Sequence, residues 1–493
     1  MYIIGVDIGT TSTKAVVFDD LGGTVARAER AYPLLHPLPH SAEQRPEEIV
    51  AACIQVLNEV MMSASLSEEA VSAVSFSAAM HSLMIIDCQG RPKSPLLTWA
   101  DERSTGATER LKERIGLSLY KKTGTPLHPM SPLTKMAWIQ EGQAPWTLQP
   151  GDRFISIKEY VFYCFFGVCW TDESMASATG LYDFTKREWS KEALQAAQIS
   201  AHNLPDIKPT KTVLRGLKKD IARETGLNEK TPFILGATDG VLANLGAGAK
   251  NDDMVMTIGT SGAIRCTLDH PVTHENGHTF CYHLSEDAWV VGGAMNNGGI
   301  VLQWAKHHLF KEAKKGRTPE ELNLWFEKEA AKVPPGCEGL ICLPYLHGER
   351  APFWETGLQG GFLGMTSRHE TSHFCRALYE GVLFQLKMVA EAVWELSPAK
   401  GKLYINGGFV RSHFWTQMLA DIFNKALVMP SHHDVSSKGA AALARQALGY
   451  PPFPEDDRCD AEQISPNATA VAQYERPYAA YKKLADAMRT LQK

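Results

Sequence analysis

The chain has 493 residues, of which 44% are hydrophobic and 21% are charged, and its formal net charge is −5. This length and composition predict a globular protein of two or three domains, and the slightly negative charge argues against a broad nucleic-acid-binding surface. The ten cysteines form no C-x-x-C pair, and the most apolar window, residues 161–170, is too short to span a bilayer. Because Met1 leads directly into a strand-like run, we expect no signal peptide. We therefore expect a cytoplasmic protein with reduced thiols and no membrane partner.

The first twenty residues predict a β-hairpin with a phosphate-binding turn. Two apolar runs, Tyr2–Val6 and Ala15–Phe18, flank a segment rich in glycine and hydroxylated residues. Consecutive backbone N–H groups in such a turn can hold phosphate oxygens, and Asp7 at the strand end is placed to hold Mg²⁺ through water. A purely structural hairpin is the alternative, because short glycine motifs give many false matches. The candidate nucleotide ligands in this turn are Gly9, Thr10, Thr11, Ser12 and Lys14.

A second copy of this pattern lies in the second half of the chain. Residues 256–261, MTIGTS, align with residues 6–11, VDIGTT, and the acid is present only in the first copy. A repeat at about half the chain length indicates duplicated domains. We expect Gly259, Thr260 and Ser261 to bind phosphates as well, and we place the domains at residues 1–246 and 247–493.

Strand-like and helix-like segments alternate through the first half, which predicts an α/β layer fold. Residues 24–32 and 71–77 read as strands, and 83–87 as another. A helix should begin at Pro46, because apolar residues then recur at helical spacing. The apolar window 161–170 predicts a buried helix.

Polar segments of the first half are candidate parts of a substrate site. Met80 and His81 follow the strand 71–77, where a strand end often forms a pocket wall. Asp101 and Arg103 lie two residues apart, and both would face a cleft if the segment is extended. Arg103 offers a planar fork that matches a carboxylate, and Lys158 is a second candidate cation. A core histidine and a surface ion pair are the alternatives for these positions.

Asp239 is the strongest catalytic candidate. An apolar strand, Ile234–Leu235, runs through small residues into this acid and then into Gly240. Open α/β sheets bind ligands at the carboxyl ends of their strands, and phosphoryl transfer to a hydroxyl group requires a carboxylate that accepts the proton. The alternative role is that of a helix N-cap.

Two further motifs stand in the second half. Gly407 and Gly408 end a strand and permit the close approach of an adenine ring or a ribose. The segment His369–His373 fits H-E-x-x-H, the zinc pattern of metalloproteases, but the helical periodicity starts only at Phe374. We expect Thr371 or Ser372 to cap that helix, so that the two histidines would straddle its start.

Taken together, these motifs resemble the FGGY carbohydrate kinases, and among them the gluconate kinases. The first signature corresponds to MSPLTKMAWI at 130–139, the second begins with GGFLGM at 360–365, and GERAP at 348–352 and AAMHS at 78–82 also match. The resemblance implies two actin-like (ribonuclease H-like) α/β domains with an ATP and sugar cleft between them.

The same resemblance implies an activity. MgATP would phosphorylate D-gluconate to 6-phospho-D-gluconate, with Asp239 as the base on the sugar hydroxyl. It also implies sugar contacts for Met80, His81, Asp101 and Arg103, and adenosine contacts for the Gly407–Gly408 turn. A homodimer is a further implication of the resemblance. A xylulose kinase or another pentulose or polyol kinase is the nearest alternative, and a chaperone-like ATPase or a zinc hydrolase would be a different class.

Overall fold

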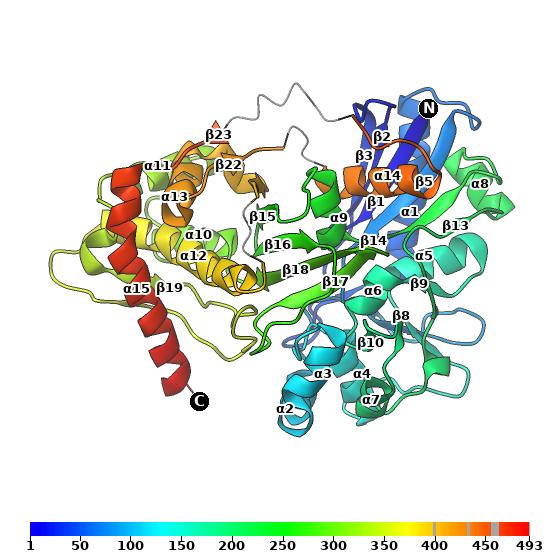
Figure 1. The fold of residues 1–493 in the computed structure, drawn as a ribbon, viewed down its shortest axis with the longest axis horizontal. Coiled ribbons are helices and arrows are strands. Elements are labelled where there is room, and N and C mark those ends of the chain that lie inside the picture. The colour runs from blue at the N-terminus through cyan, green and yellow to red at the C-terminus, as the bar shows by residue number, and fades with distance from the viewer. Residues whose placement is uncertain (398–400, 431–433, 455–462, 493) are drawn as a thin grey trace. The chain divides into compact units, whose positions relative to one another are not determined.

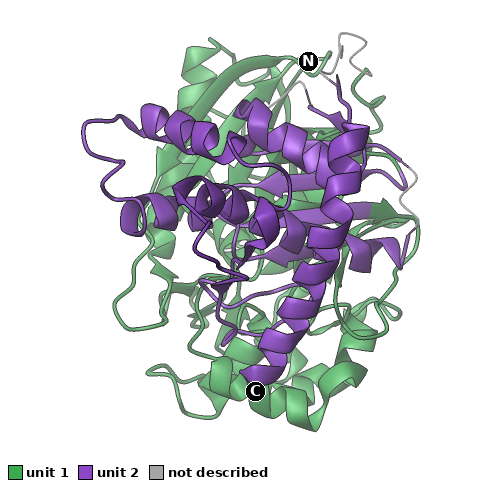
Figure 2. Cartoon of the chain, turned by 90° about the vertical axis from the view of Figure 1, so that its left-hand side faces the viewer, with its two compact units in different colours: residues 1–250, 267–291, 434–456 green, residues 251–266, 292–433, 457–493 purple. Residues whose placement is uncertain are grey.

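The computed structural model describes residues 1–397, 401–430, 434–454 and 463–492. The chain forms two compact units (Figure 2). The first contains residues 1–250, 267–291 and 434–456, and the second contains residues 251–266, 292–433 and 457–493. Each unit is thus assembled from three chain segments, and the single boundary at residues 246/247 stays a prediction.

A six-stranded sheet forms the centre of the first unit (Figure 1). Its order is β13-β14-β5-β1-β2-β3, and β14, β5 and β1 run parallel to one another while β13, β2 and β3 run antiparallel to their neighbours. The expected hairpin and the strands that follow it are confirmed. The strands are β1 (Tyr2–Ile8), β2 (Ser12–Phe18), β3 (Thr24–Ala31), β5 (Val71–Ala78), β13 (Val213–Leu214) and β14 (Phe233–Thr238).

Short strand pairs extend the first unit. They are β4 (Glu43–Gln44) with β7 (Leu96–Leu97), β6 (Met84–Ile86) with β8 (Arg153–Ile155), β9 (Trp170–Asp172) with β12 (Asp206–Lys208), and β10 (Tyr182–Asp183) with β11 (Glu188–Trp189). The strand β17 (Phe280–Ser285) also lies in this unit.

Helices cover both faces of the first sheet. Because side chains alternate along a strand, Ile4 and Val6 of β1 pack in the core that includes helix α1, whereas Ile3 packs in the core that includes Ala441 of helix α14. The helices of this unit are α1 (Pro46–Ser63), α2 (Thr105–Arg114), α3 (Gly116–Thr123), α4 (Pro132–Gln140), α5 (Ile157–Phe166), α6 (Glu173–Ser177), α7 (Lys191–Ala196), α8 (Lys219–Thr225), α9 (Asp239–Gly246) and α14 (Val435–Ala447).

The expected start of α1 at Pro46 is confirmed, and its periodic apolar residues are buried. The helix expected over residues 161–170 is displaced, because α5 runs from Ile157 to Phe166. Gly167 ends it in a left-handed conformation at φ 76°, and Trp170 already belongs to a strand. The apolar window therefore spans the end of a helix and the start of a strand, which periodicity alone does not separate.

The second unit repeats the motif of a hairpin beside a parallel strand. β15 (Met254–Ile258) pairs antiparallel with β16 (Gly262–Leu268) and parallel with β21 (Leu403–Asn406). The sheet continues through β22 (Leu427–Val428) to β23 (Gln463–Ile464), and β18 (Ala288–Met295) flanks β16. β19 (Ile341–Leu343) and β20 (Gly361–Leu363) form a separate pair.

Five helices complete the described part of the second unit. They are α10 (Gly299–His308), α11 (Pro319–Ala331), α12 (Thr371–Trp394), α13 (His413–Phe423) and α15 (Ala468–Leu491). The last of them begins at Ala468 and continues through Pro477. The Asn467 side chain caps it by accepting the Thr469 and Ala470 amides.

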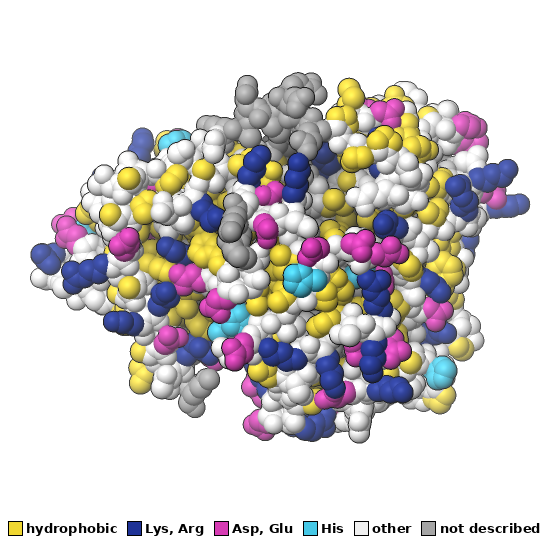
Figure 3. Space-filling view, viewed as in Figure 1, with side chains coloured by type: hydrophobic (Ala, Val, Ile, Leu, Met, Phe, Trp, Pro, Cys, Tyr) yellow, Lys and Arg dark blue, Asp and Glu magenta, His cyan; other side chains and the backbone are white. Residues whose placement is uncertain are grey.

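The surface carries both signs of charge. On the face drawn in Figure 3, Lys and Arg side chains are interspersed with Asp and Glu, as the small net charge leads one to expect. None of the helices in the described ranges combines the length and the apolar character that a membrane span requires.

Candidate active site

Three neighbouring parallel strands of the first unit end beside one another. Asp7 of β1 is opposite Ser77 of β5, and Ala78 of β5 is opposite Thr238 of β14. Asp239 follows Thr238 directly. The predicted metal ligand and the predicted base therefore lie at the carboxyl ends of strands in one sheet, the position where open α/β sheets bind their ligands.

Asp7 is a partly buried residue in a polar setting. Ser77 donates its hydroxyl hydrogen to Asp7 Oδ1 at 2.6 Å. Burial raises the pKa of Asp7, the Ser77 hydrogen bond and Lys14 counteract the rise, and the negative charges of Asp434 and Glu29 add to it. A carboxylate that keeps some exposure is the type of group that binds Mg²⁺ with its waters, so Asp7 fits the predicted role.

The first turn is anchored through its carbonyl oxygens. Gly9 O accepts from the Tyr32 hydroxyl at 2.6 Å, Thr10 O accepts from the Gln44 amide at 2.6 Å, and Thr11 O accepts from the Tyr32 amide at 3.1 Å. In a trans peptide the N–H points away from the preceding carbonyl, so these bonds also fix the directions of the amides that follow. A turn held in this way suits the binding of phosphate oxygens.

The remaining two candidates of this turn contact one acid. Ser12 donates to Glu29 at 2.7 Å, and the Lys14 ammonium lies 3.9 Å from the same carboxylate. Lys14 is also the cross-strand partner of Asp7. Its positive charge therefore lies beside the predicted metal ligand.

Asp239 is the first residue of α9, and Thr238 is the N-cap. The Oδ1 atom of Asp239 accepts a hydrogen bond from the Gly240 amide at 2.7 Å. The strand reaches this point through Gly236, which has φ +77° and leaves no room for a Cβ against the Phe76 carbonyl. The carboxylate thus lies at the positive end of a helix, where its negative charge is favoured.

Helix α14 packs closely on α9 and β1, as Figure 1 shows for the orange helix. A Cβ on Gly246 would overlap the Val435 carbonyl, and one on Gly439 would overlap the Leu242 carbonyl. Gly5 lies equally close to Ser437. A segment from near the end of the chain therefore supports the two strand ends that carry Asp7 and Asp239.

His81 is held in a defined tautomer. It has φ +69° and is buried, and Nδ1 lies 2.8 Å from the Ala178 carbonyl, to which it must donate. Nε2 then faces the Tyr282 hydroxyl at 3.5 Å. Met80 beside it is partly exposed. Tyr282 was missed by sequence reasoning, because it lies 201 residues further along the chain.

Arg103 is already paired with two carboxylates. Its Nε lies 3.1 Å from both Asp101 oxygens, and one terminal nitrogen lies 2.6 Å from both Asp101 Oδ2 and Glu43 Oε1. The guanidinium also lies over the rings of Trp138 and Trp146. Both carboxylates are buried and Arg103 is partly buried, so this is not a surface ion pair. A direct contact between Arg103 and a substrate carboxylate stays a prediction.

Lys158 is buried beside an internal carboxylate. Its ammonium is 2.5 Å from Asp172 Oδ2, and both side chains are almost fully buried. Asp172 in turn caps α6 by accepting the Met175 amide at 2.9 Å. The structure thus gives Lys158 an internal partner, which sequence spacing alone did not reveal. It does not give Lys158 the role of a second substrate cation.

Lys135 connects the candidate sugar-side segments, and sequence reasoning assigned it no role. Its buried ammonium donates to the carbonyls of His81, Thr98 and Met130 at 3.2, 2.7 and 2.8 Å. Burial lowers the pKa of Lys135 to about 7, Asp101 counteracts this change, and Arg103 adds to it. The only signal in the sequence that could have pointed to Lys135 was its place in the first signature helix.

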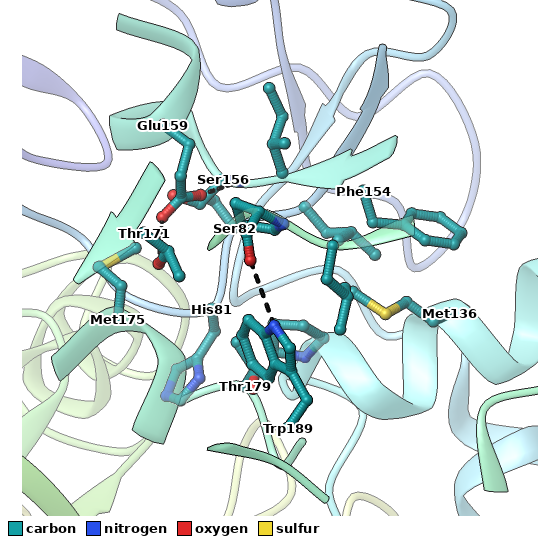
Figure 4. A pocket seen from close by; sticks show the side chains of 15 residues that line it. His81, Ser82, Met136, Phe154, Ser156, Glu159, Thr171, Met175, Thr179 and Trp189 are labelled. Carbon is teal, nitrogen blue, oxygen red and sulfur yellow. Dashed lines mark hydrogen bonds between the residues drawn. The ribbon is translucent and has the colours of Figure 1, made fainter. Parts of the chain in front are cut away.

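His81 is one of the residues that line a small cavity of about 30 Å³ (Figure 4). Glu159 and Thr171 lie on one side of it, and Phe154 and Met136 lie on the other. The Thr171 hydroxyl donates to Glu159 at 2.7 Å. This volume holds one or two water molecules and is too small for a sugar acid.

The second turn is supported by a helix start. Gly259 N donates to Ser261 O at 2.9 Å, and the amides of Gly299 and Ile300 donate to the carbonyls of Gly259 and Thr260. A Cβ on Gly298 would lie 2.5 Å from Ser261 O, which explains the glycine there. Since Ile258 pairs with Gly262, this turn is one residue shorter than the first, in which Ile8 pairs with Thr13.

Gly407 and Gly408 lie beside this second turn. Gly407 follows β21, has φ +108°, and leaves no room for a Cβ against the carbonyl of Ile258, the residue before the turn. At Gly408 a Cβ would meet no atom within 4 Å. The predicted adenosine and phosphate segments of the second unit therefore end side by side.

Glu349 fixes the loop that precedes α10. It is fully buried and accepts from the amides of Asn296 and Arg350 at 2.6 and 2.9 Å and from the Asn297 side chain at 3.0 Å. Burial raises the pKa of Glu349 to about 7. This residue was missed as a support for the second turn because its partner Asn296 lies 53 positions earlier in the chain.

The H-E-x-x-H segment forms the start of a helix. Helix α12 begins at Thr371 with Glu370 as its N-cap, one residue before the expected cap. The Nδ1 atoms of His369 and His373 accept backbone amides from Thr366 and Glu370. Within the four described ranges, no group of three His, Cys, Asp or Glu side chains is arranged to hold a metal ion.

Comparison with known proteins gives relatives along nearly the whole chain. The chain is 41% identical to the gluconokinase of Bacillus subtilis over 456 residues, which cover 91% of this chain and 88% of that protein. It is 29% identical to the xylulose kinase of the same organism, covering 98% of this chain and 96% of the relative.

Solved structures agree on the fold. A gluconate kinase and a ligand-bound xylulose kinase, both from Lactobacillus acidophilus, each superpose with a TM-score of 0.90 at 32% identity, over 99% of this chain and 98% of theirs. The family models for the N-terminal and C-terminal domains of the FGGY carbohydrate kinases match residues 2–246 and 254–448. The chain therefore belongs to the FGGY family of carbohydrate kinases.

Proposed function

We propose that this kinase transfers a phosphoryl group from MgATP to D-gluconate and forms 6-phospho-D-gluconate. The observation that carries the proposal is the difference between 41% identity to a gluconokinase and 29% identity to a xylulose kinase from the same organism. The solved structures do not separate these substrates, because the gluconate kinase and the xylulose kinase from Lactobacillus acidophilus are equally similar to the chain.

In this proposal Asp239 accepts the proton of the attacking sugar hydroxyl. Its place at a strand end and at the first turn of α9 supports this role. The turns Gly9–Ser12 and Gly259–Ser261 bind phosphate oxygens, and Gly407 and Gly408 contact the adenosine. Asp7 holds Mg²⁺, which when bound with the nucleotide neutralises phosphate charge.

The sugar acid contacts Met80, His81, Asp101 and Arg103 in this proposal. The buried pairing of Arg103 with Asp101 and Glu43 supports a role in which Arg103 shapes the site. A homodimer and a cytoplasmic location stay predictions.

The test is ADP release with MgATP and a panel of acceptors: D-gluconate, D-xylulose, L-ribulose, glycerol and no sugar. We expect kcat/KM to be highest with D-gluconate. Preference for D-xylulose would replace the substrate but keep the kinase. ADP release that does not depend on any sugar would favour a chaperone-like ATPase instead.

A further inference from the structure

A short two-stranded ribbon connects the first phosphate turn with the predicted sugar-side segment. Glu43 of β4 is opposite Leu97 of β7, and Gln44 is opposite Leu96. Successive side chains of a strand point in opposite directions. Gln44 accordingly reaches Thr10, while Glu43 accepts from Arg103 at 2.6 Å.

The carbonyl and the hydroxyl of Thr10 are both held by this region. The Gln44 side-chain amide donates to Thr10 O at 2.6 Å, and the Trp99 indole donates to Thr10 Oγ1 at 3.0 Å. An indole N–H can only donate, so the Thr10 hydroxyl accepts from it and keeps its own hydrogen for another acceptor. The anchored Thr10 carbonyl also fixes the amide of Thr11 in the opposite direction.

The ribbon is itself tied to the sugar-side segment. The amide of Ala42, the residue before β4, donates to Asp101 Oδ2 at 3.0 Å, and the Thr98 amide and hydroxyl both donate to the Ala42 carbonyl. Gln44 is buried, with 3% of its surface exposed. A buried amide donor aimed at one carbonyl of a turn sets the orientation of that peptide, because leaving either group unpaired is costly.

We propose that Gln44 and Trp99 are positioning residues of the first phosphate turn, which orient the Thr10 hydroxyl and the Thr11 amide toward the nucleotide phosphates. The proposal rests on the proposed kinase function of this turn. Neither residue needs to contact the nucleotide. Trp99 and Arg103 belong to one segment. The binding of phosphates by the first turn and the position of Arg103 in the predicted sugar site therefore depend on the same ribbon.

The experiment uses the full chain with Gln44→Met and, separately, Trp99→Phe, each of which removes one donor to Thr10. Affinity for a non-hydrolysable MgATP analogue is measured by calorimetry, and KM for MgATP and for D-gluconate is measured in parallel. We expect each variant to bind the analogue roughly tenfold more weakly, the effect of one lost hydrogen bond. The double variant should lose less than the product of the two effects, because both act on Thr10.

Gln140→Met is the matched control. The Gln140 amide donates to the Gln198 carbonyl at 2.9 Å, far from the turn in the sequence and at an exposed position. This control should bind the analogue as the wild type does. If Gln44→Met does not fold, Trp99→Phe still decides the question, since Trp99 is only partly buried.

Analogue affinity within twofold of the wild type in both folded variants would overturn the proposal, and so would an equal loss in Gln140→Met. A rise in the D-gluconate KM alone would also overturn it, because the two residues would then serve only the sugar. If the wild type binds the analogue but phosphorylates no sugar, the proposed function fails while the binding measurement still tests the positioning role.

Discussion

The ammonium nitrogen of Lys158 lies 2.5 Å from Oδ2 of Asp172, and the two side chains are 2% and 0% exposed. Two opposite charges buried together compensate each other, whereas one of them left alone is strongly unfavourable. This pair therefore joins α5 to the start of α6 and stabilises the fold of the first unit.

Replacing Lys158 with Met should lower the stability by roughly 3–5 kcal/mol, because Asp172 would keep an uncompensated buried charge. Urea unfolding of the full chain measures this loss. The double variant Lys158→Met, Asp172→Asn should recover part of it. An unchanged unfolding midpoint together with a raised KM for D-gluconate would instead restore Lys158 as a substrate contact.

Replacing Gly439 with Ala should separate α14 from α9. The added methyl group would overlap the Leu242 carbonyl, and overpacking of this kind costs about 1–3 kcal/mol. We expect lower stability and a lower kcat, because α9 carries Asp239. Gly106→Ala in α2 is the matched control, since an exposed helical glycine there has only the Arg110 side chain nearby. Equal behaviour of the two variants would show that close packing of α14 does not matter.

Replacing Lys135 with Met should raise the KM for the sugar with little change in the KM for MgATP. The ammonium holds the carbonyls of His81, Thr98 and Met130 together, and three unpaired carbonyls would loosen the segments predicted to contact the sugar. We expect at least a tenfold rise in the sugar KM, on the order of one or more lost hydrogen bonds. Steady-state kinetics with both substrates varied provide the measurement, and a rise confined to the MgATP KM would contradict this role.

Glu349 should make stability depend on pH. Its pKa is raised to about 7 from 4.5, so between these values the folded state holds a proton that the unfolded state has lost. Its contribution is fully present below pH 4.5 and is lost as the pH rises through 7. Glu349→Gln does not titrate, so the stability of the wild type relative to this variant should fall by up to about 3 kcal/mol between roughly pH 4.5 and 8. Urea midpoints of both proteins across this range test the prediction, which a constant difference would contradict.

Local patterns in the sequence were sufficient for much of the fold. The hairpins, the start of α1 at Pro46 and the strand that leads to Asp239 follow from apolar periodicity and from proline and glycine, which act within a few residues. Proline is a less certain signal at α15, because Pro477 lies inside this helix, which begins at Ala468.

The arrangement of the candidate site could not be read in the same way. That Asp7 and Asp239 share one sheet edge depends on the order β14-β5-β1, which no local pattern encodes. The buried partners of Arg103 and Lys158 are likewise tertiary contacts, and a lone charged residue in a sequence does not reveal whether it meets a substrate or an internal carboxylate. For the same reason the sequence did not reveal the internal partners of Gln44, Lys135 and Glu349, although Lys135 lies in the first signature and Glu349 in the GERAP segment.

The most direct test of the proposed mechanism is the rate of 6-phospho-D-gluconate formation by Asp239→Asn compared with the wild type at saturating MgATP and D-gluconate. Asparagine keeps the size of the side chain but cannot accept the hydroxyl proton. We predict that kcat falls by about 10²–10⁴ while the affinity for a non-hydrolysable MgATP analogue is retained. A variant that forms the product within tenfold of the wild-type rate would contradict the assignment of Asp239 as the base.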